Sequence, residues 1–291
     1  MSTCTGQMPN GGNVNCNTPL KRATALFIYD ADYKYSTASA VDNKENQRVL
    51  IQETEKLIVL PVRGMEVTGS EVQVTTDPYG DNLITGETSG GLRAYVKTNA
   101  CDFKEMLQTF KGGTYRVGAF LDDGSVYLSQ DGDGVRGIKS NLYAEALNMP
   151  TQDGADQQFV LRVDFQSIDE IRDFKIIPVN YTINELLDYV PVGLSMSVTA
   201  ISTTSFTATV TTRCTSTPFT SDLTFEPISG MGNVEVPSFT PTNNADGTYT
   251  VVTTKDTVPT SFAAGDYQKF RAVAKTGAVI DYVTNVETAQ K

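Results

Sequence analysis

The chain has 291 residues, of which 40% are apolar, and a formal net charge of −11. That length allows one large domain or two ordinary ones, and the apolar content is enough to fill real cores. The negative charge argues against a surface that grips nucleic-acid phosphates, because that affinity comes mainly from clustered Lys and Arg. Histidine is absent, which removes the commonest general base and metal ligand, so the composition disfavours an enzyme.

Residues 1–22 are rich in Asn, Gly, Thr and Pro, and this composition predicts an extended N-terminal arm. The arm lacks the basic and apolar regions of a secretory signal, and no segment is long enough for a spanning helix, so we expect no membrane contact.

Four cysteines are widely spaced, without a CxxC pair, and are expected to be free thiols in a reducing compartment. A Cys4–Cys16 crosslink within the arm is the alternative. Cys101 and Cys214 lack a basic partner that would make a thiolate reactive, so core packing is their expected role.

Residues 23–190 are predicted to form the first domain, whose first strand is expected at Ala25–Tyr29. The polar residues 36–48 predict an exposed loop or a frayed helical turn. The next stretch fits either one amphipathic turn or two short strands, and a strand at Lys56–Val62 is favoured.

Valines that alternate with polar residues around Gly69-Ser70 predict a hairpin at that position. Residues 77–91 contain many turn residues and are expected to form the longest loop of this half.

The clearest local pattern is a helix predicted over residues 102–111 and followed by a hairpin. Gly112 and Gly113 are expected to end the helix in a left-handed conformation. Alternating apolar residues on both sides of Asp122-Asp123-Gly124 then predict two paired strands. The apolar face of the helix consists of Phe103, Met106, Leu107 and Phe110.

No stretch of the sequence predicts a catalytic, cofactor or metal site. The segment from Gln130 to Gly134 superficially matches a calcium loop, but the Glu required further along is missing. It is therefore interpreted as a turn between two strands. The acidic pairs Asp30/Asp32, Asp122/Asp123 and Asp131/Asp133 are likewise interpreted as turn residues.

Asp169–Phe174 is predicted to form either a solvated turn or a short helix, and Ile183–Tyr189 is compatible with a short helix. Beyond residue 190 the chain becomes dense in Thr, Ser and Val, and evenly spaced strands over 191–291 predict a small β-sandwich. The expected fold is thus mainly β: a β-sandwich or barrel with one flanking helix, followed by a second sandwich. Strands of the second sandwich are expected at Ser195–Ala200, Ser205–Thr212, Asp222–Glu226, Gly247–Thr253, Gln268–Ala274 and Val279–Val286.

Several segments of the chain, CDFKEMLQTF, TYRVGAFLDDGSVYLS, GVRGIKSNLY and FVLRVDF, resemble the major tail (tail-tube) proteins of tailed bacteriophages. The later segments NADGTYTV and GDYQKFRAVA resemble the immunoglobulin-like domains fused to many phage structural proteins. The resemblance is one of pattern over most of the chain, and no single invariant motif carries it.

The resemblance implies a non-enzymatic virion protein, without cofactors, that assembles in the host cytoplasm and contacts other virion proteins. Its copies would form stacked hexameric rings around a lumen, where carboxylates repel DNA and let it pass without specific binding. The 77–91 segment is the expected contact between subunits. Its contact residues are predicted to be Asp77, Tyr79, Asp81, Leu83 and Ile84.

Three rival functions stay open at the sequence level. One is another position in the virion, as a neck, tail-ring or head-decoration protein. The second is a bacterial surface or carbohydrate-binding module, which predicts a cluster of exposed aromatic residues. The third is an enzyme that uses Asp131 or Asp133.

Overall fold

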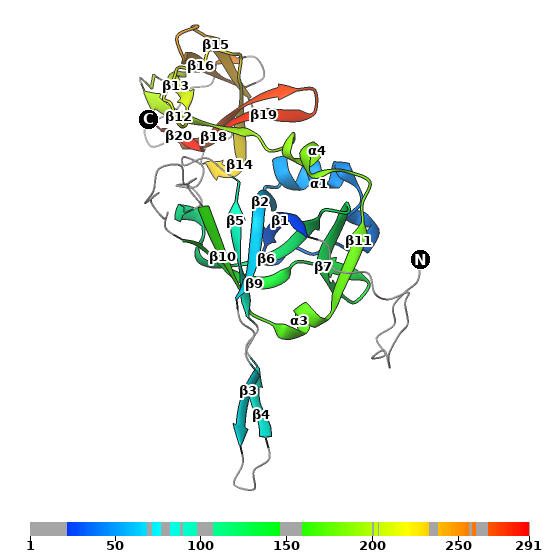
Figure 1. Cartoon of the computed structure of the whole chain (residues 1–291). Coiled ribbons are helices and arrows are strands. Elements are labelled where there is room, and N and C mark those ends of the chain that lie inside the picture. Colours follow the sequence, from blue (N-terminus) through cyan, green and yellow to red (C-terminus); the bar gives the residue numbers. More distant parts are fainter. Residues whose placement is uncertain are drawn as a thin grey trace, which may run out of the picture. The chain divides into compact units, whose positions relative to one another are not determined.

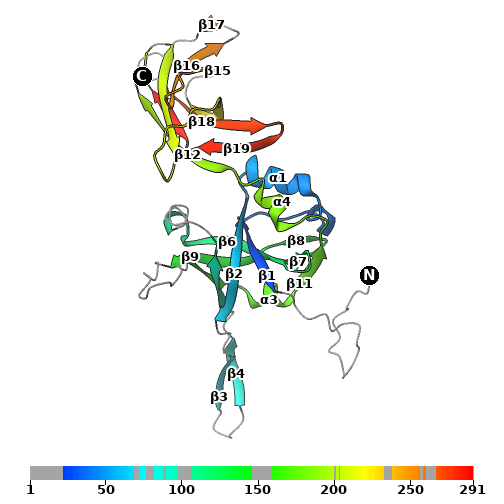
Figure 2. The same cartoon turned by 45° about the horizontal axis from the view of Figure 1, so that its top comes forward.

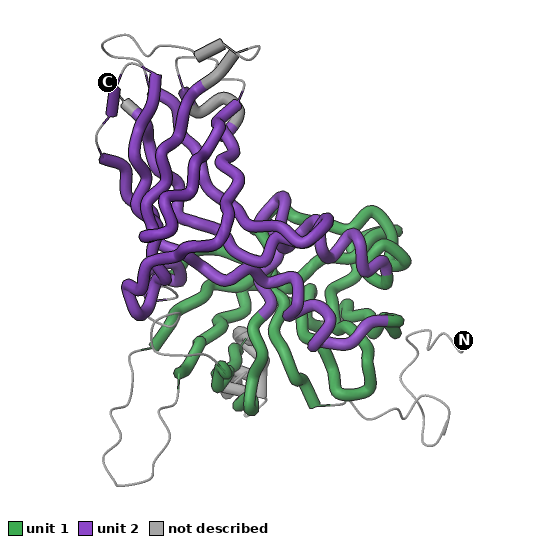
Figure 3. Tube along the Cα trace, turned by 90° about the horizontal axis from the view of Figure 1, so that it is seen from above, with its two compact units in different colours: residues 1–42, 60–97, 112–180 green, residues 43–59, 98–111, 181–291 purple. Residues whose placement is uncertain are grey.

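The computed structural model consists mainly of strands, as the sequence predicts, with one barrel-like and one sandwich-like sheet (Figure 1). Contacts divide the chain into two compact units (Figure 3). The first unit comprises Met1–Asp42, Leu60–Lys97 and Gly112–Asn180, and the second Asn43–Val59, Thr98–Lys111 and Tyr181–Lys291. The structure describes residues 22–68, 72–76, 82–87, 90–97, 107–145, 159–199, 201–202, 204–232, 238–255, 258–259 and 267–290.

The first unit is built on a sheet that closes on itself. Strands β1, β2, β5, β10, β9 and β6 are hydrogen-bonded in that order, and β1 also pairs with β6. The six strands therefore form a barrel, which removes their free edges. The described elements are β1 (Ala23–Asp30), a 3-10 helix (Ala38–Ala40), β2 (Leu57–Thr68, whose first residues belong to the second unit), β3 (Val72–Thr76), β4 (Asn82–Glu87), β5 (Gly91–Val96), β6 (Lys111–Leu121), β7 (Ser125–Asp131), β8 (Gly134–Arg136), β9 (Ile138–Glu145), β10 (Phe159–Phe165), α3 (Ile168–Arg172) and β11 (Phe174–Pro178).

The barrel core follows from alternation along its strands. On β10, Leu161 and Val163 are fully buried, whereas Arg162 between them is exposed. The expected first strand at Ala25–Tyr29 is confirmed, and all five of its residues are at most 1% exposed. Residues 25–29 are all apolar or aromatic in sequence, and such a continuous run is typical of a strand that is buried on both faces.

β3 and β4 form a separate two-stranded antiparallel sheet (Figure 2). They pair with no other described strand. The strands that precede and follow them, β2 and β5, pair with each other up to Thr68 and Gly91. The segment that contains β3 and β4 is therefore attached to the barrel at the adjacent ends of β2 and β5.

Two expectations for this region are wrong. The predicted hairpin around Gly69-Ser70 would pair the end of β2 with β3, but β2 pairs with β5 and β3 with β4. The predicted loop at 77–91 contains β4. Local alternation identified strands, but it could not identify their partners.

The first half of the helix predicted over 102–111 lies outside the described residues. Residues 107–109 are helical, and Lys111 already belongs to β6. Of the two glycines predicted to end the helix in a left-handed conformation, Gly112 has a positive φ of 87° but Gly113 does not, and both lie in strand β6. The hairpin that follows is confirmed, because β6 and β7 pair antiparallel around a turn with Gly124 at φ 77°.

The second unit contains a sandwich-like sheet in the order β14, β18, β19, β12, β13, β16, β15. Its core is aromatic: Phe206, Phe225, Phe239 and Phe270 contact one another with ring centroids 4.8–6.4 Å apart. Such rings contribute both buried area and edge-to-face contacts. The remaining elements of this unit are α1 (Lys44–Gln52), α4 (Ile183–Leu187), β12 (Val192–Thr199), β13 (Ser205–Thr212), β14 (Thr224–Gly232), β15 (Ser238–Asn243), β16 (Thr248–Lys255), β17 (Val258–Pro259), β18 (Tyr267–Thr276), β19 (Val279–Thr284) and β20 (Glu287–Gln290).

Helix α1 corrects the expectation of a loop or frayed turn at 36–48. It spans Lys44–Gln52 and belongs to the second unit, although it lies in the sequence between two barrel strands. This grouping differs from the predicted domains, in which residues 23–190 stay together. The expected short helices near residues 170 and 185 are present as α3 and α4.

Candidate assembly surfaces

One outer face of the barrel is polar across four neighbouring strands, β2, β5, β10 and β9. Outward side chains on paired strands form rows across a sheet. In the central row, Glu66, Arg93, Arg162 and Tyr143 are consecutive register partners, and all four are exposed. Arg93 and Arg162 are directly opposite each other in this row, so two positive charges lie on neighbouring strands.

Each arginine of the row has a carboxylate partner. Arg93 Nη2 lies 3.3 Å from Glu145 Oε1, and Arg162 Nε lies 2.8 Å from Asp164 Oδ1. The hydrogen bond with Asp164 raises the pKa of Arg162. Like charges directly opposite each other destabilise a sheet, and the carboxylates offset that repulsion. Because these pairs are exposed, each contributes about 1 kcal/mol at most.

The polar face is close to electrically neutral, so the net charge of the chain does not gather on it. Glu66 adds a further carboxylate, and its hydrogen bond with the Tyr95 hydroxyl raises the pKa of that tyrosine. The described charged residues on these four strands are the cations Arg63, Arg93, Lys139 and Arg162 and the carboxylates Glu66, Glu145 and Asp164.

The second surface is the β3–β4 hairpin, which contains part of the predicted subunit contact. Leu83 and Ile84 lie on β4, opposite Thr75 and Val74 of β3. The hairpin thus places these two predicted residues on strands that have no other described partner. The other three predicted residues, Asp77, Tyr79 and Asp81, lie outside the described residues.

The acidic turn residues have structural partners. Asp131 Oδ2 lies 3.1 Å from Lys34 Nζ and 3.2 Å from Arg136 Nη1. The hydrogen bond with Lys34 holds the pKa of Asp131 below its ordinary value. Asp123 Oδ1 accepts a hydrogen bond from the Ser125 main-chain N at 3.1 Å, as in an Asx turn. Asp123 therefore has the turn role that the sequence predicts, whereas Asp131 is the last residue of β7 and forms ion pairs.

A third group of charges holds helix α3 against the barrel strands. Glu170 accepts hydrogen bonds from the Lys139 main-chain N at 2.7 Å and from Arg116 Nη1 at 3.3 Å, and it lies 2.9 Å from Arg136 Nη2. Arg116 Nη1 also donates to the Gly137 carbonyl at 3.0 Å. Glu170 is only partly exposed and has several donors, so its carboxylate is satisfied and this cluster has a structural role.

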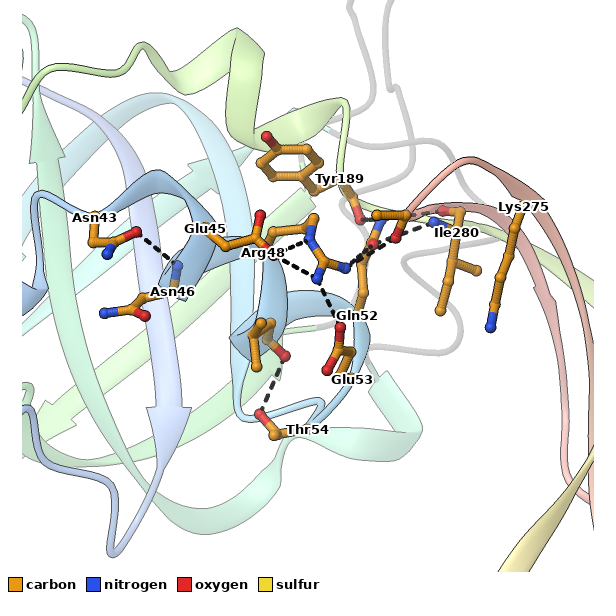
Figure 4. A network of polar contacts seen from close by, with 12 residues as sticks. Asn43, Glu45, Asn46, Arg48, Gln52, Glu53, Thr54, Tyr189, Lys275 and Ile280 are labelled. Carbon is orange, nitrogen blue, oxygen red and sulfur yellow. Dashed lines mark hydrogen bonds and ion pairs between the residues drawn. The ribbon is translucent and has the colours of Figure 1, made fainter.

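Helix α1 is joined to the sandwich through Gln52, which is 2% exposed (Figure 4). Its Nε2 donates to the Tyr189 carbonyl at 2.8 Å and to the Ile280 carbonyl at 3.2 Å. Its Oε1 accepts from the Ile280 main-chain N at 3.2 Å. One side chain therefore satisfies backbone groups of both the segment before β12 and the start of β19.

Arg48 forms the second part of this joint and is 7% exposed (Figure 4). Its Nη1 donates to the Ala278 carbonyl at 3.0 Å, in the turn between β18 and β19, and to Gln52 Oε1 at 3.3 Å. Its Nη2 lies 2.6 Å from Glu45 Oε1 and 2.7 Å from Glu53 Oε1. The bonds with Glu45 and Glu53 raise the pKa of the guanidinium, which stays charged although it is buried.

Helix α4 contacts helix α1 through Glu185, which is also one of its N-terminal capping residues. Thr182 and Glu185 form a capping box, so each side chain accepts a hydrogen bond from the other's main chain. Glu185 Oε1 also lies 2.7 Å from Lys44 Nζ. The bond with Lys44, followed by those with Thr182, lowers the pKa of Glu185 to about 2.

The outer face of β12, β13, β16 and β15 carries hydroxyl groups in register. Ser197, Thr209 and Thr248 are consecutive partners across three strands. The described outward residues of this face include neither a charged nor an aromatic side chain. They are Ser195, Ser197, Thr199, Ser205, Thr207, Thr209, Thr211, Ser238, Thr240, Thr242, Thr248, Thr250 and Val252.

Cys214 corrects the expectation of free thiols packed in a core. It is exposed and disulfide-bonded. The other cysteines, Cys4, Cys16 and Cys101, lie outside the described residues. A crosslink of this kind stabilises a fold mainly by restricting the unfolded chain.

Among the described residues, no three or more Cys, Asp or Glu side chains are arranged to hold a metal ion. The described helices are all too short or too polar to cross a membrane. No family model matches the chain, and no curated protein is similar to it. The polar barrel face, the hairpin and the hydroxyl face are therefore the features that bear on function.

Proposed function

We propose that this protein is a non-enzymatic structural protein of a phage virion, whose copies assemble into stacked rings that form a tail tube for DNA passage. The observation that carries the proposal is the β3–β4 hairpin. It continues from two adjacent strands of a closed barrel and pairs with no other described strand. A two-stranded hairpin alone is marginally stable in water, so contact with another subunit would stabilise it.

The barrel itself favours association through the hairpin. Because its six strands close on themselves, they offer no edge to a neighbour. Half of the 69–90 segment, fully extended, reaches roughly 36 Å, which is enough to contact the next subunit. A contact between two different surfaces of identical subunits generates closed rings or open stacks.

The polar face of β2, β5, β10 and β9 is the proposed lining of the channel, since its first two strands carry the hairpin. The lining differs from the lumen of carboxylates that the resemblance implies, because its cations and carboxylates are balanced. Arg93 and Arg162 are held by carboxylates and are poorly placed to release counterions from DNA. Such a surface would neither hold nor strongly repel a phosphate backbone.

Two other functions fit less well. A neck, tail-ring or head-decoration protein is a rival from the same virion, and such a protein would stop at one closed ring. A carbohydrate-binding module would be expected to present exposed aromatic residues. The hydroxyl face of the sandwich has none among its described residues, which disfavours sugar stacking there.

Negative-stain microscopy of the purified full chain tests the proposal. We expect rings that stack into open tubes as the protein concentration rises. A control variant joins Thr68 to Gly91 through Asn-Gly, which removes the hairpin and leaves a tight turn between β2 and β5. This variant should form no stacks. Single closed rings would favour a neck or ring protein, and a chain that stays monomeric would contradict the proposal.

A further inference from the structure

Strand β11 ends the barrel sheet, and β7 is its only partner among the described strands. The hydrogen bonds between β7 and β11 continue beyond both ends of β11. The Gln130 main-chain N donates to the Asp173 carbonyl at 2.7 Å, and the Val179 main-chain N donates to the Gly124 carbonyl at 3.1 Å. These residue pairs continue the β7–β11 register, so every second residue of β11 bonds to β7.

The same alternation shows which backbone groups face outward. The bonding positions are odd-numbered, so the main-chain N–H and C=O groups of Phe174 and Ile176 point away from β7. Pro178 adds a carbonyl but has no N–H. The free edge of β11 thus presents donors and acceptors that an added strand could pair with.

The side chains along this edge are apolar and exposed. Phe174 is 46% exposed and Ile176 is 36% exposed. Tyr127 of β7 stacks on Phe174, with ring centroids 5.1 Å apart and an interplanar angle of 19°. Natural proteins usually protect an edge strand with charges or prolines, and here only Lys175 and the terminal Pro178 do so. An edge that exposes two large apolar side chains is nevertheless typical of an interface.

We propose that the β11 edge receives a strand of the β3–β4 hairpin from a second copy of the chain. This inference rests on the proposed function and names the surface that the hairpin contacts. The lengths match, since β11 and β3 have 5 residues each and β4 has 6. Each copy offers both halves of the contact at different places, so the contact is heterologous and propagates from copy to copy.

The N-terminal segment is the rival occupant of this edge. The Arg22 carbonyl accepts a hydrogen bond from the Asp122 main-chain N at 2.8 Å. The same β6–β7 turn contains Gly124, whose carbonyl holds Val179 just after β11. Arg22, the first described residue, therefore lies near the end of β11, and the segment that precedes it in the sequence is a rival for the edge. The hairpin is favoured because its strands are already formed and have unpaired edges.

Photo-crosslinking of the full chain separates these occupants. p-Benzoylphenylalanine in place of Phe174 should crosslink to residues 69–90 of another copy, and mixing isotope-labelled with unlabelled chain shows which crosslinks join two copies. The same probe in place of Tyr267, which is 38% exposed, is the control and should give no such product. Crosslinks from position 174 to residues 1–21, or only within one copy, would overturn the inference.

A second variant, Phe174→Lys with Ile176→Lys, tests the energetics of the edge. Both side chains are exposed, so the fold should be kept, as far-UV circular dichroism would show. We expect the concentration needed for assembly to rise about 10-fold or more, as for loss of a central apolar contact. Assembly at the original concentration would overturn the inference and leave the tail-tube proposal standing. A wild-type chain that never assembles would overturn both.

Discussion

The joint between helix α1 and the sandwich predicts that Gln52→Leu destabilises the second unit. Leucine fills a similar volume but cannot form hydrogen bonds. The substitution removes the partners of the Tyr189 carbonyl and of both main-chain groups of Ile280. It also removes one acceptor of the buried Arg48 guanidinium, 3.3 Å away.

The magnitude follows from the number of groups that lose a partner. Each buried polar group left without a partner costs about 1–3 kcal/mol. Three backbone groups therefore set a range whose lower end is about 3 kcal/mol. We expect the lower end, because the leucine side chain recovers part of the loss by apolar burial.

Urea unfolding followed by circular dichroism measures this change in the free energy of unfolding. Gln130→Leu is the matched control, because the Gln130 side chain is exposed and its Nε2 donates to the nearby Gly132 carbonyl at 3.2 Å. That control should change the free energy of unfolding by about 0.5 kcal/mol at most. A loss below about 1 kcal/mol for Gln52→Leu would refute the role given to the joint.

Three further predictions concern pH and backbone conformation. The pKa of Glu185 is lowered from 4.5 to about 2, so its stabilising effect is full above pH 4.5 and is lost as the pH falls towards 2; urea midpoints of wild type and Glu185→Gln should converge over that window. Burial raises the pKa of Tyr249 from 10.0 to about 12, so its effect is full below pH 10 and is lost as the pH rises through 12; Tyr249→Phe should flatten this alkaline dependence in circular dichroism. Gly112→Ala should lower the free energy of unfolding in urea by about 1–3 kcal/mol, because φ is 87° and the new Cβ would lie 2.7 Å from Tyr143 Cε1. Gly124→Ala is the control, since Gly124 has a positive φ but open space around it, and it should cost less. An equal cost for the two variants would show that the contact with the Tyr143 ring is unimportant.

Strands were predictable where the sequence alternates and both ends carry turn signals. Ser205–Thr212 is β13 as predicted, since its apolar residues alternate with Thr. β15 was missed because it contains Pro241, and a proline argues against a strand except at the edge of a sheet. β15 is an edge strand of its sheet.

Helix α1 was missed because its buried face mixes polar and apolar side chains. Gln47, Arg48 and Gln52 are buried beside Leu50 and Ile51, so the apolar stripe that identifies amphipathic helices is interrupted. Arg48 and Gln52 are bonded to groups more than a hundred residues away, at Tyr189, Ala278 and Ile280. Sequence windows do not contain that information.

The candidate surfaces were only partly predictable. The 77–91 segment was predicted to be a loop, but it contains β4, whose pairing with β3 between the adjacent strands β2 and β5 depends on residues far apart in the sequence. The polar barrel face was not predicted at all. Glu66, Arg93 and Arg162 belong to three strands, and only the register of the closed barrel brings them into one row.

Sedimentation velocity over a range of protein concentrations tests the central claim, self-assembly through the hairpin, most directly. The full chain should show a concentration-dependent shift from monomer to rings and larger stacks, and the variant that joins Thr68 to Gly91 should not. A full chain that sediments as a monomer at every concentration, or a variant that assembles as well as wild type, would contradict the account.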